Sequence, residues 1–179
     1  MVLAAILAAI LGQAVPEWPA KAPDQWIQGG PLTLAGLRGK AVLIRFFMDS
    51  GCPYCRGTAP TLNAFHEEFA ARGLVVVGMY TPKPRPRAVT GDEVRGYVKA
   101  YGFKFPVAID ADWSALRKLW LDRAPGAAFT SATLLIDRRG ILRHVQKGGV
   151  YAKDASDPQA RLDYEAMREA IVELLAESP

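Results

Sequence analysis

The most constraining feature of the sequence is a nearly continuous apolar run, residues 41–48, followed after a gap of three residues by Cys52 and Cys55. An apolar run of this length predicts a strand that is buried on both faces of a sheet. After the cysteines, apolar residues recur at helical spacing and predict a helix that continues to about Arg72 and ends at Gly73. The two cysteines are therefore expected where a buried strand passes into a helix.

The remaining patterns predict an α/β chain in which strands and helices alternate before a closing hairpin and a last helix. Further strands are expected at residues 31–34, 74–80, 107–110, 133–136 and 141–145, and further helices at residues 92–101, at residues 113–120 and from Pro158 to the C-terminus. Residues 81–89 hold three prolines and predict a loop. The segment at residues 80–83 follows a predicted parallel strand, a position where open sheets bind ligands. Strand–helix–strand units pair in parallel and a hairpin adds antiparallel strands, so a central mixed sheet flanked by helices is predicted.

Composition narrows the class of protein. The 179 residues are half hydrophobic and 22% charged, which is typical of one globular domain with a substantial core. The 22 basic and 18 acidic residues give a net charge of +4 that is spread along the chain. The densest basic stretch, residues 83–87, is short, broken by prolines and without aromatic residues, so no nucleic-acid partner is predicted.

The N-terminal residues form a separate segment. Residues 2–11 are an uninterrupted apolar run, too short for a spanning helix of roughly 20 residues but suited to the core of a secretory signal. The small residues Gly12 and Ala14 follow where a cleavage site would lie, although no Lys or Arg precedes the run. We therefore predict that residues 1–14 are a signal peptide or N-terminal anchor of a periplasmic or otherwise exported protein, and that residues 15–179 are its folded domain. A buried first helix is the alternative, and membrane contact is expected only through the anchor.

The chain has two cysteines, and their spacing indicates chemistry rather than a structural disulfide. An exported scaffold held by disulfides carries more cysteines at wider spacing. A structural zinc site needs four ligands, and beyond Cys52 and Cys55 the chain offers His66 and His144, neither at ligand spacing. Both histidines are expected to have structural or surface roles. No metal and no other cofactor is predicted.

The predicted position of the pair suits thiol–disulfide exchange, in which a thiolate attacks a disulfide. At the start of a helix, unpaired N–H groups and the helix dipole favour the thiolate of Cys52. Pro53 fits the first helical position, where its missing N–H costs nothing. Cys55, one turn into the helix and less exposed, is expected to resolve the mixed disulfide that Cys52 forms.

Pro60, eight residues after Cys52, completes a pattern that resembles the thiol-disulfide oxidoreductases of the TlpA/ResA type, in the redoxin group. The Pro53-Tyr54 dipeptide between the cysteines is similar to that of glutaredoxins. The resemblance implies a thioredoxin-like fold after a short N-terminal extension. It also implies two kinds of partner, protein thiols or disulfides and an upstream electron donor or acceptor. The matching segments are residues 31–34, 37–47, 52–55, 60 and 133–140.

The chain departs from that family in the loop opposite the cysteines. These proteins usually carry a cis-proline just before the strand at residues 133–136, where this chain has Thr130 and Ser131. A cis bond without proline costs about 3 to 4 kcal/mol, so a trans bond is expected. Because that loop normally pairs with the substrate backbone, both residues are candidate supporting residues. The full supporting set is Pro53, Tyr54, Pro60, Thr130 and Ser131.

Three further departures concern the surroundings of the sulfurs. Gly51 stands where a tryptophan often precedes the first cysteine, which is expected to leave its sulfur less covered. Arg45 replaces a polar or acidic residue of the relatives, and Thr58 stands where ResA-like proteins carry a glutamate. No proton acceptor for the resolving cysteine is evident, and Asp49 is the nearest carboxylate in the sequence.

The favoured hypothesis is an exported thiol-disulfide oxidoreductase that exchanges disulfides with proteins through Cys52 and Cys55. A peroxiredoxin-like thiol peroxidase is an alternative, but those enzymes place Thr or Ser three residues before the reactive cysteine, where this chain has Asp49. A copper(I)-binding carrier is another, because soft thiolates select that ion. The direction of electron flow depends on the reduction potential.

Overall fold

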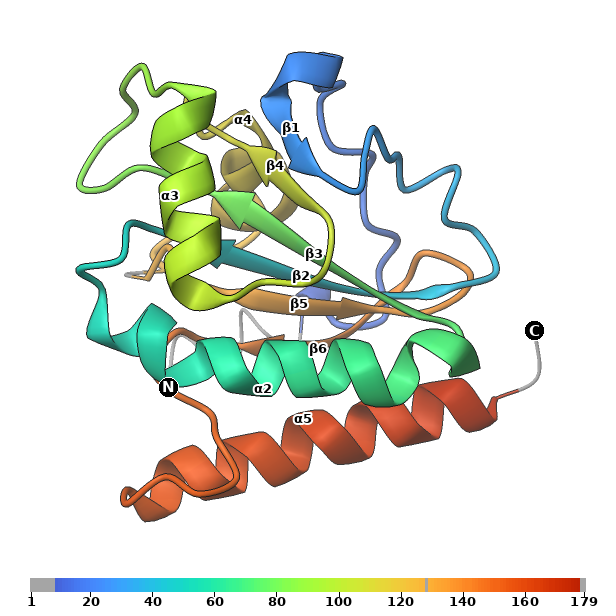
Figure 1. Ribbon diagram of the computed structural model, residues 1–179. Coiled ribbons are helices and arrows are strands. Elements are labelled where there is room, and N and C mark those ends of the chain that lie inside the picture. Colours follow the sequence, from blue (N-terminus) through green and yellow to red (C-terminus); the bar gives the residue numbers. More distant parts are fainter. Residues whose placement is uncertain (1–8, 128, 178–179) are drawn as a thin grey trace.

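The computed structural model describes residues 9–127 and 129–177, and its centre is a six-stranded mixed sheet (Figure 1). The strands lie in the order β1-β4-β3-β2-β5-β6, in which β2, β3 and β4 are parallel and the other three pairings are antiparallel. The predicted mixed sheet is confirmed. Apart from β1, each strand lies within one residue of its predicted bounds. The strands are β1 (Trp26–Gln28), β2 (Ala41–Phe47), β3 (Leu74–Tyr80), β4 (Val107–Ile109), β5 (Thr133–Ile136) and β6 (Leu142–Gln146).

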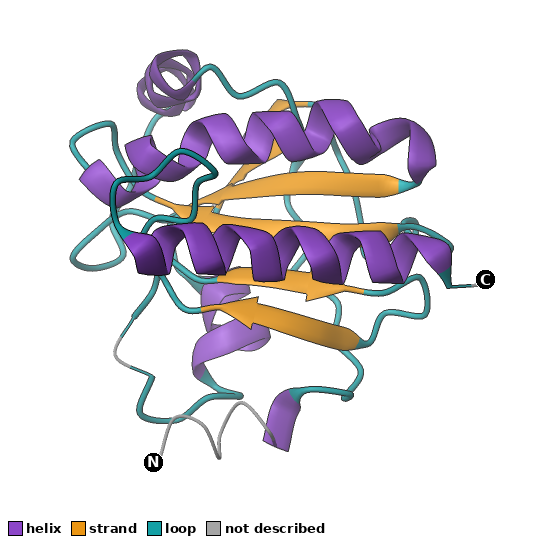
Figure 2. Cartoon of the chain, turned by 90° about the horizontal axis from the view of Figure 1, so that it is seen from below, coloured by secondary structure: helices purple, strands orange, loops and turns teal. Residues whose placement is uncertain are grey.

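Helices cover both faces of this sheet. One face carries α2 (Pro53–Phe69), α3 (Gly91–Tyr101) and α5 (Pro158–Ala176). The other carries α4 (Ser114–Leu116), which continues as a π-helical turn, η3 (Arg117–Leu121). Two short turns of 3-10 helix, η1 (Pro23–Gln25) and η2 (Ala70–Arg72), precede β1 and follow α2. Figure 2 shows the two long helices, α2 and α5, side by side across the sheet.

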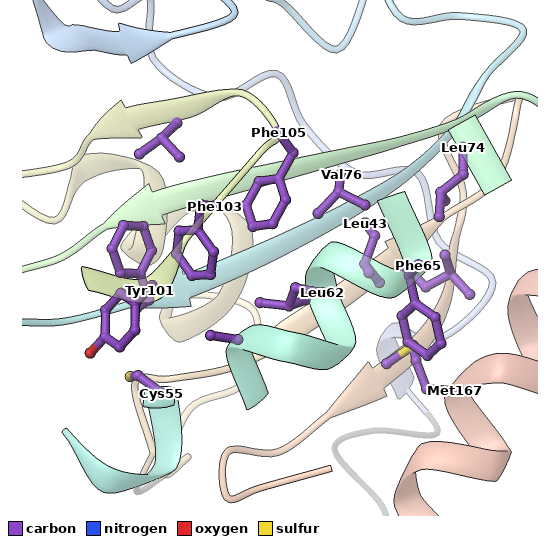
Figure 3. Packing of buried hydrophobic residues seen from close by; sticks show 14 of the residues in the cluster. Leu43, Cys55, Leu62, Phe65, Leu74, Val76, Tyr101, Phe103, Phe105 and Met167 are labelled. Atoms are coloured by element: carbon purple, nitrogen blue, oxygen red, sulfur yellow. The ribbon is translucent and has the colours of Figure 1, made fainter. Parts of the chain in front are cut away.

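The central strand β2 is buried on both faces, as its continuous apolar run predicts. None of its seven residues is more than 2% exposed. Leu43 lies in the core with Leu62 of α2 and Met167 of α5 (Figure 3), whereas Ile44 lies in the opposite core with Trp120. Fully burying one such side chain contributes roughly 1.5–3 kcal/mol, so burial on both faces fixes β2 in the middle of the fold.

The strand predicted at residues 31–34 is wrong, and the first strand lies earlier, at Trp26–Gln28. The backbone near residues 31–34 bonds to a side chain instead of to a strand. The Glu17 carboxylate accepts the N–H groups of Leu34 and Ala35, both at 2.8 Å. β1 pairs with the free edge of β4, where its Trp26 side chain is buried. A short alternating pattern therefore forms a strand only where a partner edge is available.

The described part of the N-terminal segment runs along the edge strand β6. The N–H of Gly12 donates to the Leu142 carbonyl at 2.8 Å, and the Leu142 N–H donates to the Gln13 carbonyl at 3.0 Å. Ile10 is only 4% exposed. The predicted leader, residues 1–14, lies partly outside the described residues, and its described part covers this sheet edge. Among the described residues, no helix is long and apolar enough to cross a membrane.

Deleting residues 1–14 is expected to lower the free energy of unfolding by roughly 3 kcal/mol, because two backbone hydrogen bonds and the buried Ile10 are lost. Chemical denaturation of the full and shortened chains measures the difference. Leu11→Ala is the control, because Leu11 is 39% exposed and its truncation should change stability little. Equal stability of the two chains would show that the segment contributes nothing to the fold.

Candidate active site

The two cysteines lie at the N-terminus of α2, just beyond the carboxyl end of β2. Cys52 is the N-cap residue, with an extended backbone (φ −73°, ψ 111°), and its sulfur accepts the N–H of Cys55 at 3.2 Å. Pro53 occupies the first turn of the helix, as the sequence predicts. A sulfur in this position faces the unpaired N–H groups of the first helical turn, which stabilise negative charge.

Both cysteine side chains are largely covered by the protein. Cys52 is 6% exposed and Cys55 is 2% exposed, so the first cysteine is the more accessible, as expected. Although Gly51 places no side chain over this sulfur, Cys52 packs within the core on the α2 face of the sheet. Tyr54, between the cysteines, is 59% exposed. It is a large hydrophobic side chain on the surface of the motif.

The surroundings of Cys55 hold it as a thiol. Burial raises the pKa of this thiol to about 11, and the nearby charge of Arg45 acts in the opposite direction. The Tyr101 side chain lies beside Cys55 (Figure 3), and its hydroxyl donates to the Met48 carbonyl at 3.2 Å. Burial also raises the pKa of Tyr101, so this phenol keeps its proton at neutral pH. Cys55 must therefore pass its proton to another group before it attacks a disulfide.

A guanidinium lies in the core beneath the motif. Arg45 is 1% exposed and shares its face of β2 with Leu43 and Phe47, the face that α2 covers. Its Nη1 donates to Thr133 Oγ1 at 3.1 Å, and the guanidinium lies 5.7 Å from the centre of the Tyr151 ring. Within the described residues, its Nε and Nη2 have no hydrogen-bond partner. Neutral groups therefore accept only some of the hydrogen bonds that this guanidinium can donate. Its positive charge can still stabilise a nearby thiolate.

Two positions singled out by their sequence have structural roles. Thr58 is fully buried, and its hydroxyl donates to the Tyr54 carbonyl at 2.9 Å, one helical turn back. The Asp49 carboxylate accepts the N–H of Gly51 at 2.9 Å and fixes the turn before the cysteines. In the described part of the chain, neither side chain bonds to a cysteine sulfur. The side chains of Asp49 and Thr58 are thus engaged with the backbone rather than with the dithiol.

The loop that holds Thr130 and Ser131 reaches the same edge of the sheet as the motif. β5 begins just after this loop and pairs Thr133 with Arg45, near the end of β2 from which the cysteines follow. The Thr130–Ser131 bond is trans, as predicted, and the cis bonds of the described residues both precede prolines elsewhere. The loop keeps its place at this edge without the usual proline.

A groove of about 1140 Å³ lies beside the motif, between α2 and the segment that joins β6 to α5. Tyr54, Gly57 and Pro60 line it from α2, and Val150 lines it from the joining segment. Gly57 allows the two walls to approach, because a Cβ there would come within 2.9 Å of Val150. Two of the predicted supporting residues, Tyr54 and Pro60, thus face one groove that is large enough for a segment of a partner chain.

Similarity to known proteins agrees with this geometry. Residues 11–145 match the sequence profile of the AhpC/TSA family. The chain belongs to this family. It is 31% identical over 121 residues to protein DipZ of Mycobacterium bovis, covering 66% of this chain and 16% of DipZ. It is 24% identical over 124 residues to the thiol-disulfide oxidoreductase ResA of Halalkalibacterium halodurans, covering 69% of this chain and 63% of ResA.

The fold has a counterpart among solved structures. The crystal structure of a thioredoxin-like superfamily protein aligns with a TM-score of 0.67 and 28% identity, covering 92% of this chain and 97% of that one. These matches confirm the predicted thioredoxin-like fold and the predicted likeness to oxidoreductases of the TlpA/ResA type. The chain spans less than two thirds of the length of either curated relative.

Sequence reasoning did not identify Tyr101, and it singled out Lys83 only as part of the segment at residues 80–83. Tyr101 ends a helix and has the pattern of an ordinary core residue. Lys83 lies in the loop after β3, and loops that follow parallel strands often contact ligands. This position was the one sequence feature that pointed to Lys83. Among the described residues, no group of three or more His, Cys, Asp or Glu side chains is placed to hold a metal ion.

Replacing Arg45 with Met is expected to raise the pKa of Cys55 further, because a cation that favours the thiolate is removed. In a Cys52→Ser background, the alkylation rate of Cys55 at a fixed pH should then fall about tenfold, since the rate follows the thiolate fraction. Arg56→Met is the matched control, because Arg56 is exposed on α2. An unchanged alkylation rate in Arg45→Met would show that the buried guanidinium does not act on this sulfur.

Proposed function

We propose that this protein is an exported thiol-disulfide oxidoreductase that exchanges disulfides with proteins through Cys52 and Cys55. The contact that carries the proposal is the hydrogen bond from the Cys55 N–H to the Cys52 sulfur, at 3.2 Å. It puts the more accessible sulfur at a helix N-terminus, with the second cysteine one turn away. The likeness to ResA, a thiol-disulfide oxidoreductase by name, supports the same chemistry.

The reaction proceeds in two exchanges. In the reducing direction, the Cys52 thiolate attacks one sulfur of a substrate disulfide, and the other substrate sulfur leaves as a thiolate. Cys55 then gives up its proton and attacks the Cys52 sulfur, which releases the second substrate sulfur. The substrate has gained two electrons, and the protein holds the Cys52–Cys55 disulfide until an upstream donor reduces it. The oxidising direction runs the same steps in reverse.

The groove beside the motif supports a protein as the substrate. It leads from the exposed Tyr54 along α2 to the beginning of α5, and both polar and apolar residues line it. Thr61 on α2 and Gln146 at the end of β6 supply side chains that can hydrogen-bond to a peptide backbone. A small disulfide would use only the end of this groove, next to Tyr54.

The apolar run at residues 2–11 supports export, because such a run is the core of a secretory leader. The contacts of Gly12 and Gln13 with β6 favour an uncleaved anchor over cleavage after Ala14. Cleavage there would remove these contacts and expose the edge of β6 to solvent. A periplasmic or other exported location also suits a reactive disulfide couple. The mass of the N-terminal peptide of the exported protein decides between the two.

Cys52→Ser is expected to abolish disulfide exchange with a protein substrate such as insulin, because the attacking thiolate is lost. Cys55→Ser should keep the attack but fail to resolve it, so a mixed disulfide accumulates and is detected as a mass increase. Ser50→Ala is the control and should retain activity. Full activity in both cysteine variants would end the proposal.

The same preparations separate the alternatives. Oxidation of Cys52 by hydrogen peroxide far faster than oxidation of a free thiol would favour a thiol peroxidase. Copper(I) held against a strong chelator would favour a metal carrier. The reduction potential of the couple gives the direction of electron flow, since about −270 mV marks a reductant and about −120 mV an oxidant.

Tyr54→Ala is expected to raise KM for a protein disulfide about tenfold, because exposed aromatic residues contribute much of the binding energy of protein contacts. KM for a small disulfide should change far less. Leu162→Ala on α5 is the matched control, because Leu162 is 63% exposed and does not line the groove. Equal effects of Tyr54→Ala on both substrates would place the protein contact elsewhere.

A further inference from the structure

The loop after β3 brings a lysine to the cysteine motif. β2 and β3 are parallel and in register up to Phe47 and Tyr80, and the Thr81 N–H continues the pairing by donating to the Phe47 carbonyl at 2.8 Å. The segments that follow both strands therefore leave the sheet at one edge, next to each other. One segment leads to Cys52, and the other reaches Lys83 three residues beyond β3.

Trp113 holds this lysine in place. Its indole N–H donates to the carbonyl of Pro82 at 2.8 Å, and Lys83 Nζ lies 4.4 Å from the centre of its ring. Trp113 has a left-handed backbone (φ 63°), a conformation that few residues other than glycine adopt and that needs support from its surroundings. The contact directs the ammonium inward against an apolar surface rather than outward to water.

The ammonium of Lys83 is buried without a hydrogen-bond partner. Its Nζ atom is inaccessible to solvent, and no group among the described residues accepts a hydrogen bond from it. An ammonium has three donors, and burying it unpaired is costly. The charged or titratable groups that act on Lys83 are Cys55, Asp110 and Cys52, in that order.

The carboxylate of Asp110 already accepts hydrogen bonds from other groups. It accepts from Lys21 Nζ at 2.8 Å and from the backbone N–H groups of Ala115 at 2.8 Å and Leu116 at 2.9 Å. Neither sulfur accepts a hydrogen bond from Lys83 Nζ in this structure, but the negative charge of either thiolate would favour the protonated form of Lys83. Of the other groups around Cys55, Tyr101 keeps its proton and Arg45 has no lone pair to offer.

We propose that Lys83 is the proton-transfer partner of the dithiol and takes the proton that Cys55 loses when it resolves the mixed disulfide. This inference rests on the proposed function. The neutral Lys83 amine accepts the proton from the Cys55 thiol, and the Cys55 sulfur forms a bond to the Cys52 sulfur. The bond between Cys52 and the substrate breaks, and the substrate sulfur leaves with the electron pair. The Lys83 ammonium then returns its proton to that sulfur or to water.

The pKa values of Lys83 and Cys55 are consistent with this proton transfer. Burial lowers the pKa of Lys83 to about 8, although both sulfurs and Asp110 favour its charged form. A useful fraction of the amine is therefore neutral near neutral pH, whereas Cys55, with a pKa of about 11, is almost entirely a thiol. Raising the pH through about 8 removes the proton from Lys83 and should speed the resolving step, which then levels off.

The test separates the two thiol steps in one experiment on the full-length reduced protein. Rapid mixing with the aromatic disulfide DTNB releases one coloured thiolate when Cys52 attacks and a second when Cys55 resolves. In Lys83→Met, the second release is expected to slow about 100-fold, the size typical of a lost general base. The rise of its rate near pH 8 should disappear, and the first release should change far less.

Two further variants make the outcome specific. Lys83→Arg keeps the positive charge but cannot take a proton, so it should remain as slow as Lys83→Met. Lys99→Met is the matched control, because Lys99 is exposed at the end of α3. A normal second release in Lys83→Met, or full rescue by Lys83→Arg, would overturn proton transfer while leaving the dithiol reaction intact. Absence of the second release in the unaltered protein would instead refute the proposed function.

Discussion

The parallel pairing of β2 with β3 determines where every candidate reactive group lies. The two strands are in register over seven residue pairs, from Ala41 opposite Leu74 to Phe47 opposite Tyr80. Parallel strands end at the same edge of a sheet, so the cysteine motif after β2 and the loop after β3 emerge together. Antiparallel β5 begins at that edge as well. Segments far apart in the sequence thus meet because one pair of buried strands keeps its register.

Two buried basic side chains, Arg45 and Lys83, exchange charge effects with the dithiol. Arg45 lies in the core near Cys55, and Lys83 Nζ is buried where the charge of either sulfur would act on it; both side chains have unpaired donors among the described residues. Buried cations are costly unless an anion accompanies them. The dithiol supplies such an anion only when it is reduced and deprotonated, because a disulfide carries no charge. On the proposed function, a positive charge on either residue would therefore favour the thiolate form of the reduced protein over the disulfide.

The sequence predicted the elements that depend on local pattern. The apolar run of β2 and the helix that follows it fold as their spacing indicates, and the cysteines lie at their junction. The prediction of a strand at residues 31–34 was wrong because a strand at the edge of a sheet needs a neighbouring strand with an unpaired edge. An alternating sequence pattern does not show whether such an edge is available. The burial of Lys83 could not be predicted from the sequence either, since a lysine among three prolines has the composition of a solvated loop. Its burial depends on Trp113, thirty residues away.

Asp110 connects the N-terminal extension to the chemistry. The charge of this buried carboxylate favours the protonated form of Lys83 and so raises the pKa of that lysine. Lys21 comes from the segment before β1, and its side chain is only 3% exposed where it meets Asp110. Two backbone N–H groups at the start of α4 also donate to this carboxylate. Through Lys21, the extension therefore places a positive charge against the buried carboxylate and opposes its effect on the pKa of Lys83.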